Sequence, residues 1–395
     1  MDLLILDLVI LAGFLGFLFI EKWTLGRRRR RLPLVICVTG TRGKSTVTRQ
    51  IAAAFRAAGR TVVGKTTGSK PVLILPDGSE REIMRPGMPT ILEQKRILAA
   101  AARLRADTLV AEMMSIGPEC LAAESGKILR PDILVLTNVR LDHEEEMGRT
   151  EEGIAGSLAA AISPGCAVLF SEDEFFPAFE RAARTRSARL VKIPAGVWGD
   201  LLPGFDFPEN VRLSLAAAEQ AGLDRETALK GIAGARPDFG GLKTWSLSSP
   251  LSGRIWTCAS LFAANDPEST RIALERIRMR GSFGGKTTIA LLNLRADRES
   301  RTRRWLEAVR AGFFSGIDRI VFIGEQASAL GRMRFPRPGD VPAVLAVSGK
   351  TAVRVMSALW PMSAEETVVI GIGNIAGIGR ALVEFWESQG TPVSC

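Results

Sequence analysis

A glycine-rich stretch at residues 40–46 has the residue types that bind the phosphates of a nucleotide. Its glycines, Gly40 and Gly43, allow backbone N–H groups to turn inward, and a helix that starts near Lys44 directs its positive end to the same point. In such loops the lysine reaches the β- and γ-phosphates, and the next hydroxyl, here that of Ser45, binds Mg²⁺. The predicted ATP-binding residues of this loop are Gly40, Thr41, Arg42, Gly43, Lys44, Ser45 and Thr46.

The stretch is a variant of the standard phosphate loop. The standard pattern has a glycine five residues before Gly43, where this chain has Val38. The apolar run 34–38 precedes the loop and a helical pattern follows it, which is the context that a phosphate loop requires. A chance match in an ordinary strand-to-helix turn is the alternative.

Glu112 and His143 lie near the ends of two later apolar runs. Residues 108–114 and 133–137 are expected to be buried strands, and ligands collect at the carboxyl ends of such strands. A carboxylate beside a triphosphate requires a metal ion between the two, so we interpret Glu112 as a Mg²⁺ ligand. A solvated strand end is the alternative. His143 is the only histidine of the chain, and its place after a buried strand favours a functional role.

The pattern around these residues predicts an α/β fold. Apolar strands alternate with helical stretches, such as those at 47–58 and 90–105, at a spacing that is typical of a mostly parallel sheet covered on both faces. The other strands that we expect lie at 61–68, 72–75, 288–294, 319–323 and 367–370. The predicted division is an N-terminal segment at 1–31, a central phosphate-loop domain at 32–242 and a smaller Rossmann-like α/β domain at 243–395.

The composition excludes some classes of function. The 395 residues carry a formal net charge of +10, which suits anionic partners such as nucleotides, lipid head groups or a polyacid. The chain has no tyrosine and only 6% aromatic residues, so it lacks the stacking side chains of a single-strand binder, and nucleic acid is not expected as a partner. Its five cysteines are scattered, and their odd number argues against a disulfide framework.

The N-terminal segment predicts a membrane anchor. Residues 3–20 are almost wholly apolar, and five consecutive arginines follow at 27–31. The run is just long enough to span a hydrocarbon core, although Asp7 within it is unfavourable. Because arginines after an apolar run stay on the cytoplasmic side, we expect one anchor in the cell membrane and a catalytic domain in the cytoplasm. A buried core helix is the alternative.

Two other glycine-rich stretches imitate nucleotide-binding motifs. Residues 284–288 resemble a second phosphate loop, but they precede an expected strand instead of following one. Residues 371–376 match a dinucleotide fingerprint, but too little chain follows for the second strand and its ribose-binding acid. We expect tight backbone packing or a substrate loop at 371–376.

The order of these motifs resembles the Mur ligase superfamily of ATP-dependent amide ligases. The resemblance rests on residues 38–45, Glu112, residues 137–143, Asn210 at the start of an alanine-rich helix, and residues 263–269 and 296–298. Within the superfamily, residues 65–69, 76–78, 93–94 and 293–298 resemble the CapB/PgsB family of poly-γ-glutamate synthase subunits. The resemblance covers nearly the whole chain and includes the short N-terminal membrane segment.

This resemblance implies a ligase that uses ATP and Mg²⁺, or alternatively Mn²⁺, to form γ-glutamyl amide bonds through an acyl phosphate. The implied catalytic residues are Lys44, Glu112 and His143, and the implied metal ligands are Ser45, Glu112 and His143. Asn265, Arg295, Asp297 and Arg298 of the C-terminal domain would bind the nucleotide. The implied partners are glutamate, the growing poly-γ-glutamate chain, the membrane and other membrane subunits of the synthase complex, and a homo-oligomer is compatible with the family.

Three other functions fit parts of the sequence. A membrane-tethered regulatory ATPase or kinase would share the phosphate loop and the N-terminal segment. A non-catalytic scaffold of a polymer-synthesis complex would tolerate the loss of Glu112. A folate-type polyglutamylating ligase would share the chemistry, but its soluble substrate does not call for an anchor.

Overall fold

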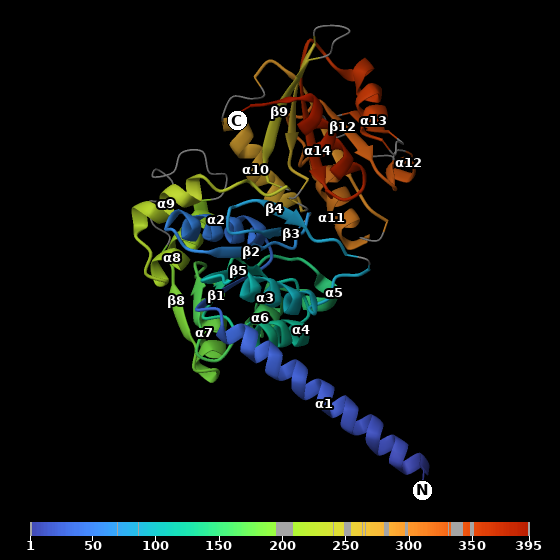
Figure 1. Cartoon of the computed structure of the whole chain (residues 1–395). Coiled ribbons are helices and arrows are strands. Elements are labelled where there is room, and N and C mark those ends of the chain that lie inside the picture. The colour runs from blue at the N-terminus through green and yellow to red at the C-terminus, as the bar shows by residue number, and fades with distance from the viewer. Residues whose placement is uncertain are drawn as a thin grey trace. The chain divides into compact units, whose positions relative to one another are not determined.

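The computed structural model divides the chain into two compact units, Met1–Asp238 and Phe239–Cys395 (Figure 1). It describes residues 2–68, 70–85, 87–194, 208–239, 241–248, 254–262, 264, 266–279, 284–296, 299–330, 332, 343–347 and 351–393. Each unit has its own sheet with apolar packing on both faces. The predicted α/β class is therefore confirmed.

The sheet of the first unit has eight strands within the described ranges, in the order β4-β3-β2-β5-β1-β6-β7-β8. Neighbours from β2 to β8 pair in parallel, whereas β3 and β4 form an antiparallel edge. The bounds are β1 Leu34–Thr39, β2 Val62–Lys65, β3 Val72–Ile74, β4 Glu80–Glu82, β5 Thr108–Glu112, β6 Ile133–Leu136, β7 Ala167–Phe170 and β8 Arg189–Lys192. The strand before the phosphate loop, β1, is thus central, with β5 and β6 on its two sides.

Helices cover both faces of this sheet because the buried strand residues alternate between the faces. Ile36 and Val38 of β1 belong to the core beneath α2, α8 and α9, and Val35 and Cys37 belong to the core beneath α3, α4, α6 and α7. The bounds are α2 Lys44–Ala57, α3 Glu93–Arg103, α4 Pro118–Ala123, α5 Glu144–Met147, α6 Glu151–Ala159, α7 Phe176–Thr185, α8 Pro208–Gln220 and α9 Arg225–Ala233. A π-helix, η1 (Glu124–Leu129), continues α4.

The second unit repeats this construction with a sheet in the order β13-β12-β11-β14-β10-β9-β15. Its strands are β9 Lys243–Ser248, β10 Ile255–Ser260, β11 Thr287–Asn293, β12 Arg319–Ile323, β13 Ala343–Ala346, β14 Glu366–Gly373 and β15 Thr391–Pro392. Neighbours from β13 to β10 pair in parallel, and β9 is antiparallel to both β10 and β15. Its helices are α10 Pro267–Met279, α11 Glu299–Arg310, α12 Ala327–Leu330, α13 Ala352–Leu359, the short η3 Trp360–Met362, and α14 Ile378–Gln389.

The glycines at the end of β14 serve close packing. A Cβ atom on Gly371 would lie 2.2 Å from Cε2 of Phe262. The Asn293 side chain donates hydrogen bonds to the carbonyl oxygens of Asn374 and Ala376. These contacts account for the glycines at 371–376 by tight packing, which is one of the two roles expected from the sequence.

The N-terminal helix α1 (Asp2–Arg30) corrects the prediction of a membrane anchor. Within the part of the chain that the structure describes, no helix is both long and apolar enough to cross a bilayer. The physical reason is that Asp7 and Glu21 leave an uncharged run of only residues 8–20, about 20 Å of helix against a hydrocarbon core of about 30 Å. The predicted membrane-spanning segment, and with it the predicted cell-membrane location, is therefore wrong.

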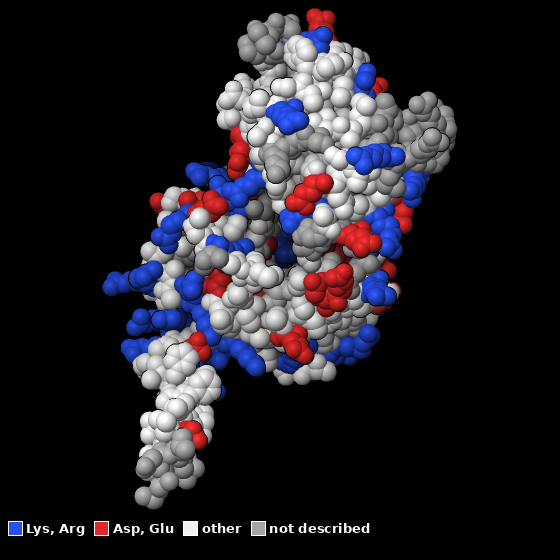
Figure 2. Space-filling model, turned by 90° about the vertical axis from the view of Figure 1, so that its right-hand side faces the viewer, with Lys and Arg blue, Asp and Glu red and all other residues white. Residues whose placement is uncertain are grey.

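Helix α1 has an exposed apolar part and a part that is fixed to the first unit by ion pairs. Large apolar side chains from Ile5 to Ile20 are exposed, and Figure 2 shows this stretch as an almost uncharged surface. Toward its C-terminal end, the helix is fixed by ion pairs: Glu21 contacts Lys95 of α3 at 2.6 Å, and Arg29 contacts Asp132 at 2.7 Å. The alternative of a buried core helix is therefore also not what the structure shows.

We predict that Gly231→Ala destabilises the first unit, because a Cβ atom there would lie 2.6 Å from Cα of Ala54 in α2. Forcing the two helices apart costs about 2 kcal/mol. The measurement is thermal and urea unfolding followed by far-UV circular dichroism. The matched control is Gly156→Ala in α6, where a Cβ atom would meet nothing within 4 Å. An equal loss of stability in both variants would contradict the close packing of α2 on α9.

Candidate functional site

The loop between β1 and α2 has a backbone that only glycine adopts without strain. Gly40 has a φ of 127° and Gly43, the N-cap of α2, has a φ of 79°. A Cβ atom on Gly40 would lie 2.1 Å from Oγ1 of Thr137, and one on Gly43 would lie 2.5 Å from Oδ1 of Asn210. The two glycines are therefore required both by conformation and by the closeness of their neighbours.

Lys44, the first residue of α2, folds back over this loop. Its Nζ donates hydrogen bonds to the carbonyl oxygens of Gly40 at 2.7 Å and Thr41 at 3.2 Å. Desolvation lowers the pKa of Lys44, and the negative charges of Glu112 and Asp142 oppose this effect. The ammonium group thus lies in a site where added negative charge, such as that of a phosphate, stabilises its charged form.

Asn138, just beyond β6, holds the loop in place. Its Oδ1 accepts hydrogen bonds from the Thr41 hydroxyl at 2.6 Å and from the Arg42 backbone N–H at 2.9 Å. Its carbonyl oxygen accepts a further bond from the Thr41 N–H at 3.2 Å. The end of β6 and the phosphate loop are therefore joined, as expected for neighbouring parallel strands.

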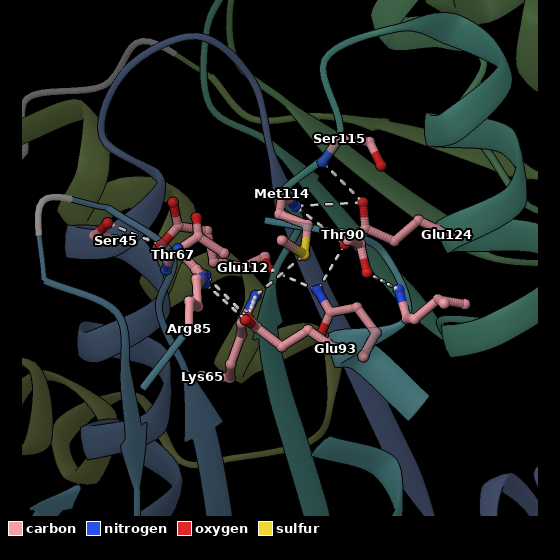
Figure 3. Close-up of polar contacts among 12 residues, drawn as sticks. Ser45, Lys65, Thr67, Arg85, Thr90, Glu93, Glu112, Met114, Ser115 and Glu124 are labelled. Carbon is pink, nitrogen blue, oxygen red and sulfur yellow. Dashed lines mark hydrogen bonds and ion pairs between the residues drawn. The ribbon is translucent and has the colours of Figure 1, made fainter. Parts of the chain in front are cut away.

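Glu112, the last residue of β5, lies at the start of α2 because Val38 of β1 pairs with it in register. Its side chain is buried, and its Oε2 accepts hydrogen bonds from the Ser45 hydroxyl at 2.8 Å and from the Thr67 N–H at 2.7 Å (Figure 3). The alternative of a solvated strand end is therefore excluded. The Ser45 hydroxyl and the Glu112 carboxylate thus place two oxygen atoms, both suitable as metal ligands, at the end of the phosphate loop.

This pair fits a hard divalent cation. Mg²⁺ and Mn²⁺ prefer oxygen ligands, and a serine hydroxyl with one carboxylate is a common protein contribution to a metal–nucleotide site. Gly68 leaves room beside the pair, since a Cβ atom there would lie 2.6 Å from Oγ of Ser45. Within the described ranges no group of three or more His, Cys, Asp or Glu residues is arranged to hold a metal on its own. A metal at this pair would therefore need further oxygen atoms from the nucleotide or from water.

His143 is connected to the phosphate loop through its neighbour. It has a φ of 46°, a left-handed conformation that is uncommon for a non-glycine residue, and its N–H donates to Oδ1 of Asp142 at 3.0 Å. Its Nε2 lies 3.9 Å from Oδ2 of Asp142, and the same carboxylate pairs with Arg42 at 3.0 Å. The structure therefore brings His143 to the Arg42 side of the loop, and its role as a metal ligand stays a prediction.

The predicted nucleotide-binding residues of the second unit are only partly within the described residues. Asn265, Asp297 and Arg298 lie outside them. Arg295 follows β11, is half-buried, and its carbonyl oxygen accepts a hydrogen bond from the Thr302 hydroxyl at 3.4 Å. The predicted roles of these four residues stay predictions.

A buried carboxylate at Glu124, which the sequence analysis did not single out, lies behind Glu112. Glu124 accepts hydrogen bonds from Nε2 of Gln94 at 2.6 Å and from the backbone N–H groups of Met114 at 3.0 Å and Ser115 at 2.9 Å (Figure 3). These N–H groups belong to the second and third residues after Glu112. The sequence around Glu124 gives no motif, so only the three-dimensional contacts identify it.

A second buried charge cluster lies at the end of β2. Lys65 is fully buried, and its Nζ lies 3.1 Å from Oε1 of Glu93, which also pairs with Arg85 at 2.7 Å (Figure 3). Desolvation lowers the pKa of Lys65, with the charges of Glu93 and Glu112 acting in the opposite direction. The cluster fixes the segment that carries Thr67, and thus one of the two donors to Glu112.

A third cluster fixes the helix that follows the phosphate loop. Arg49 of α2 is buried and pairs with Glu80 of β4 and, at 3.3 Å, with Asp238. Desolvation alone would lower the pKa of Arg49, but the hydrogen bond to Glu80 and the charge of Asp238 outweigh it, so the pKa is raised. These pairs join α2 to the antiparallel edge of the sheet and to the last residue of the first unit.

Comparisons with known proteins agree with this architecture. The Mur ligase middle domain family matches residues 38–196, and the poly-gamma-glutamate synthase CapB C-terminal domain family matches residues 249–389. The chain is 30% identical over 367 residues to the capsule biosynthesis protein CapB of Bacillus anthracis, covering 91% of this chain and 77% of that protein. It is also 30% identical over 361 residues to the PGA synthase CapB of Bacillus subtilis (strain 168), covering 89% of this chain and 90% of that protein.

Solved structures show the same fold at lower sequence identity. A folylpolyglutamate synthase of Thermotoga maritima has a TM-score of 0.66 at 15% identity, covering 93% of this chain and 92% of that one. A folylpolyglutamate synthase/dihydrofolate synthase of Yersinia pestis, solved with AMPPNP and a Mn ion, has a TM-score of 0.62 at 14% identity, covering 95% and 97%. The predicted resemblance is therefore confirmed: this chain belongs to the CapB family of the Mur ligase superfamily and is an ATP-dependent amide ligase.

Proposed function

We propose that this chain joins glutamate residues through γ-amide bonds, with ATP and Mg²⁺, by way of an acyl phosphate. The observation that carries the proposal is the hydrogen-bonded pair of Ser45 and Glu112 at the end of the phosphate loop. A buried carboxylate at a loop built for anions is consistent with a cation between carboxylate and phosphate. The CapB relatives, one of them named PGA synthase, support the substrate class.

The proposed reaction has two steps. In the first, a γ-carboxylate oxygen of the acceptor attacks the γ-phosphorus of ATP, the bond from this phosphorus to its bridging oxygen breaks, and ADP leaves. In the second, the amino nitrogen of the incoming glutamate attacks the acyl carbon, phosphate leaves, and the nitrogen loses a proton. The first step places negative charge on the transferring group, so its rate depends on positioned positive charge.

The described residues divide this task between them. The N–H groups of the loop and the Lys44 ammonium bind the phosphates, and Asn138 keeps the loop rigid. Ser45 and Glu112 would hold Mg²⁺, which neutralises phosphate charge when it is bound. We assign His143 to a second metal, oriented by Asp142, and Asn265, Arg295, Asp297 and Arg298 to the nucleotide and the anionic acceptor.

The partners of this reaction follow from its chemistry. The acceptor is a chain of γ-linked glutamate, which carries one negative charge per residue and suits a protein with a net charge of +10. The CapB relatives support a synthase complex with further subunits.

A single assay tests the proposed function against its alternatives. The chain, alone and with its synthase partners, is incubated with ATP, Mg²⁺, labelled glutamate and short γ-linked glutamate oligomers. We expect ADP release that depends on glutamate, a labelled product that resists α-peptidases, and loss of both when EDTA removes the metal. Phosphate release without glutamate would indicate a regulatory ATPase. Transfer of label from γ-³²P-labelled ATP to a protein, in a parallel incubation, would indicate a kinase, and no turnover of ATP would indicate a scaffold. Each of these results contradicts the proposal.

We predict that Lys44→Ala lowers the rate of ADP release by about a hundredfold or more, because the variant removes a preorganised positive charge from the transferring phosphoryl group. Steady-state kinetics with saturating glutamate measures the effect. The control is Lys127→Ala, which removes an exposed lysine of the same unit. Wild-type turnover in Lys44→Ala would refute the assignment of this residue.

We predict that Gly43→Ala abolishes nucleotide binding, because the new Cβ atom would lie 2.5 Å from Oδ1 of Asn210 at a φ of 79°. Gly165→Ala is the matched control: its φ is 74°, and a Cβ atom there would meet nothing within 4 Å. Both variants carry the same backbone strain, but only the first disturbs the loop. Titration with a fluorescent ATP analogue should give wild-type affinity for the control, and equal weakening in both would mean that strain alone is responsible.

A further inference from the structure

We propose that Glu124 is a positioning residue that sets the Glu112 carboxylate for metal binding, acting through Gln94 and the backbone of residues 114 and 115. The inference rests on the proposed function, since it deepens the account of the same metal site. Glu124 itself does not touch the phosphate loop in any described contact, so it acts through its neighbours. The argument depends on its burial, on its hydrogen-bond donors and on the position of those donors in the chain.

The Glu124 carboxylate is fully buried, and both of its oxygens accept hydrogen bonds. Oε1 accepts from Nε2 of Gln94 at 2.6 Å and from the Met114 N–H at 3.0 Å, and Oε2 accepts from the Ser115 N–H at 2.9 Å. A buried carboxylate is very unfavourable without such donors. The buried charge of Glu124 therefore favours the backbone conformation that keeps the N–H groups of Met114 and Ser115 directed at it.

The donors lie where the pairing of β5 with β1 ends. The Met113 N–H still donates to the carbonyl oxygen of Val38 at 2.9 Å, in continuation of the β5–β1 pairing. From Met114 onward, the N–H groups turn to Glu124 instead. Glu124 therefore replaces the neighbouring strand as the hydrogen-bond acceptor from the second residue after the proposed metal ligand onward. It fixes the direction in which the chain leaves the sheet.

Gln94 connects the two carboxylate residues directly. Its Nε2 donates to Glu124 and also to the carbonyl oxygen of Glu112 at 3.1 Å. Its Oε1 is buried and has no hydrogen-bond partner among the described residues. The opposite orientation of the amide would place its oxygen against the oxygen atoms of Glu112 and Glu124. Gln94 therefore keeps its NH₂ group toward these two acceptors, although its own oxygen is left without a hydrogen bond. Unsatisfied buried polar atoms are rare in native proteins. We attribute this one to the need for two hydrogen bonds that hold Glu112 and Glu124 in position.

The π-helix that begins at Glu124 is a further sign of a functional role for this residue. Glu124 is the first residue of the π-helix Glu124–Leu129, directly after α4. Such wide turns are rare and occur frequently at functional sites. The Glu112 carboxylate itself accepts from Ser45 and Thr67, whereas the Glu112 carbonyl oxygen accepts from Gln94, which Glu124 holds in place.

The test uses Glu124→Gln, which keeps the shape of the side chain but presents an NH₂ group to donors at one end. Mn²⁺ binding to the full chain is measured by electron paramagnetic resonance in the presence of a non-hydrolysable ATP analogue. We expect about tenfold weaker Mn²⁺ binding, as for outer partners of metal ligands. Affinity for the analogue without metal, and the far-UV circular dichroism, should stay at wild-type values. The matched control is Glu119→Gln, an exposed glutamate of the preceding helix, which should bind Mn²⁺ as the wild type does.

A second variant keeps the inference testable if Glu124→Gln does not fold. Gln94→Leu removes the connecting amide and leaves both backbone donors on Glu124, and we expect several-fold weaker Mn²⁺ binding with unchanged affinity for the analogue alone. Wild-type Mn²⁺ binding in the folded variants would overturn the positioning role and leave the proposed function intact. A wild-type chain that binds no Mn²⁺ with the analogue would overturn the metal site itself, and the proposed function with it.

Discussion

A buried carboxylate beside the predicted phosphate loop is the constraint on which the first unit depends. Glu112 and a phosphate would repel each other, and burial strengthens that repulsion because little water screens it. The charge of Glu112 is stabilised by hydrogen bonds from Ser45 and Thr67 and by the nearby ammonium group of Lys44. The parallel register of β5 with β1 is what brings these groups together, so the fold and the site are a single arrangement.

Two further clusters of polar side chains hold the residues next to Glu112 in place. Lys65 with Glu93 and Arg85 fixes the strand end that carries Thr67, and Glu124 with Gln94 fixes the chain after Glu112. Lys65, Gln94 and Glu124 are fully buried, and Glu93 and Arg85 are partly buried. A buried polar atom without a partner destabilises the fold, so these contacts hold their groups in one arrangement. A proposed metal ligand is thereby supported from two sides by residues that do not contact the phosphate loop.

The sequence predicts those parts of the structure that depend on neighbouring residues. The conformations of Gly40 and Gly43 follow from the spacing of the loop, and the parallel sheet follows from its unbroken apolar strands. Glu124 could not be found in this way, because its partners are backbone N–H groups and a glutamine 30 residues away. The N-terminal anchor was predicted wrongly because the apolar run was counted across Asp7; between Asp7 and Glu21 only residues 8–20 are uncharged. Asn265, Asp297 and Arg298 lie outside the described residues, so their roles rest on the family resemblance.

The ion pair between Arg49 and Asp238 fixes the point at which the chain leaves the first unit. Asp238 is the final residue of the first unit, and its carboxylate is anchored to the helix that starts at Lys44. The covalent tether to the second unit therefore starts from a fixed point and not from a slack loop. The same guanidinium also pairs with Glu80, so the start of this tether is held to both α2 and the antiparallel edge of the sheet.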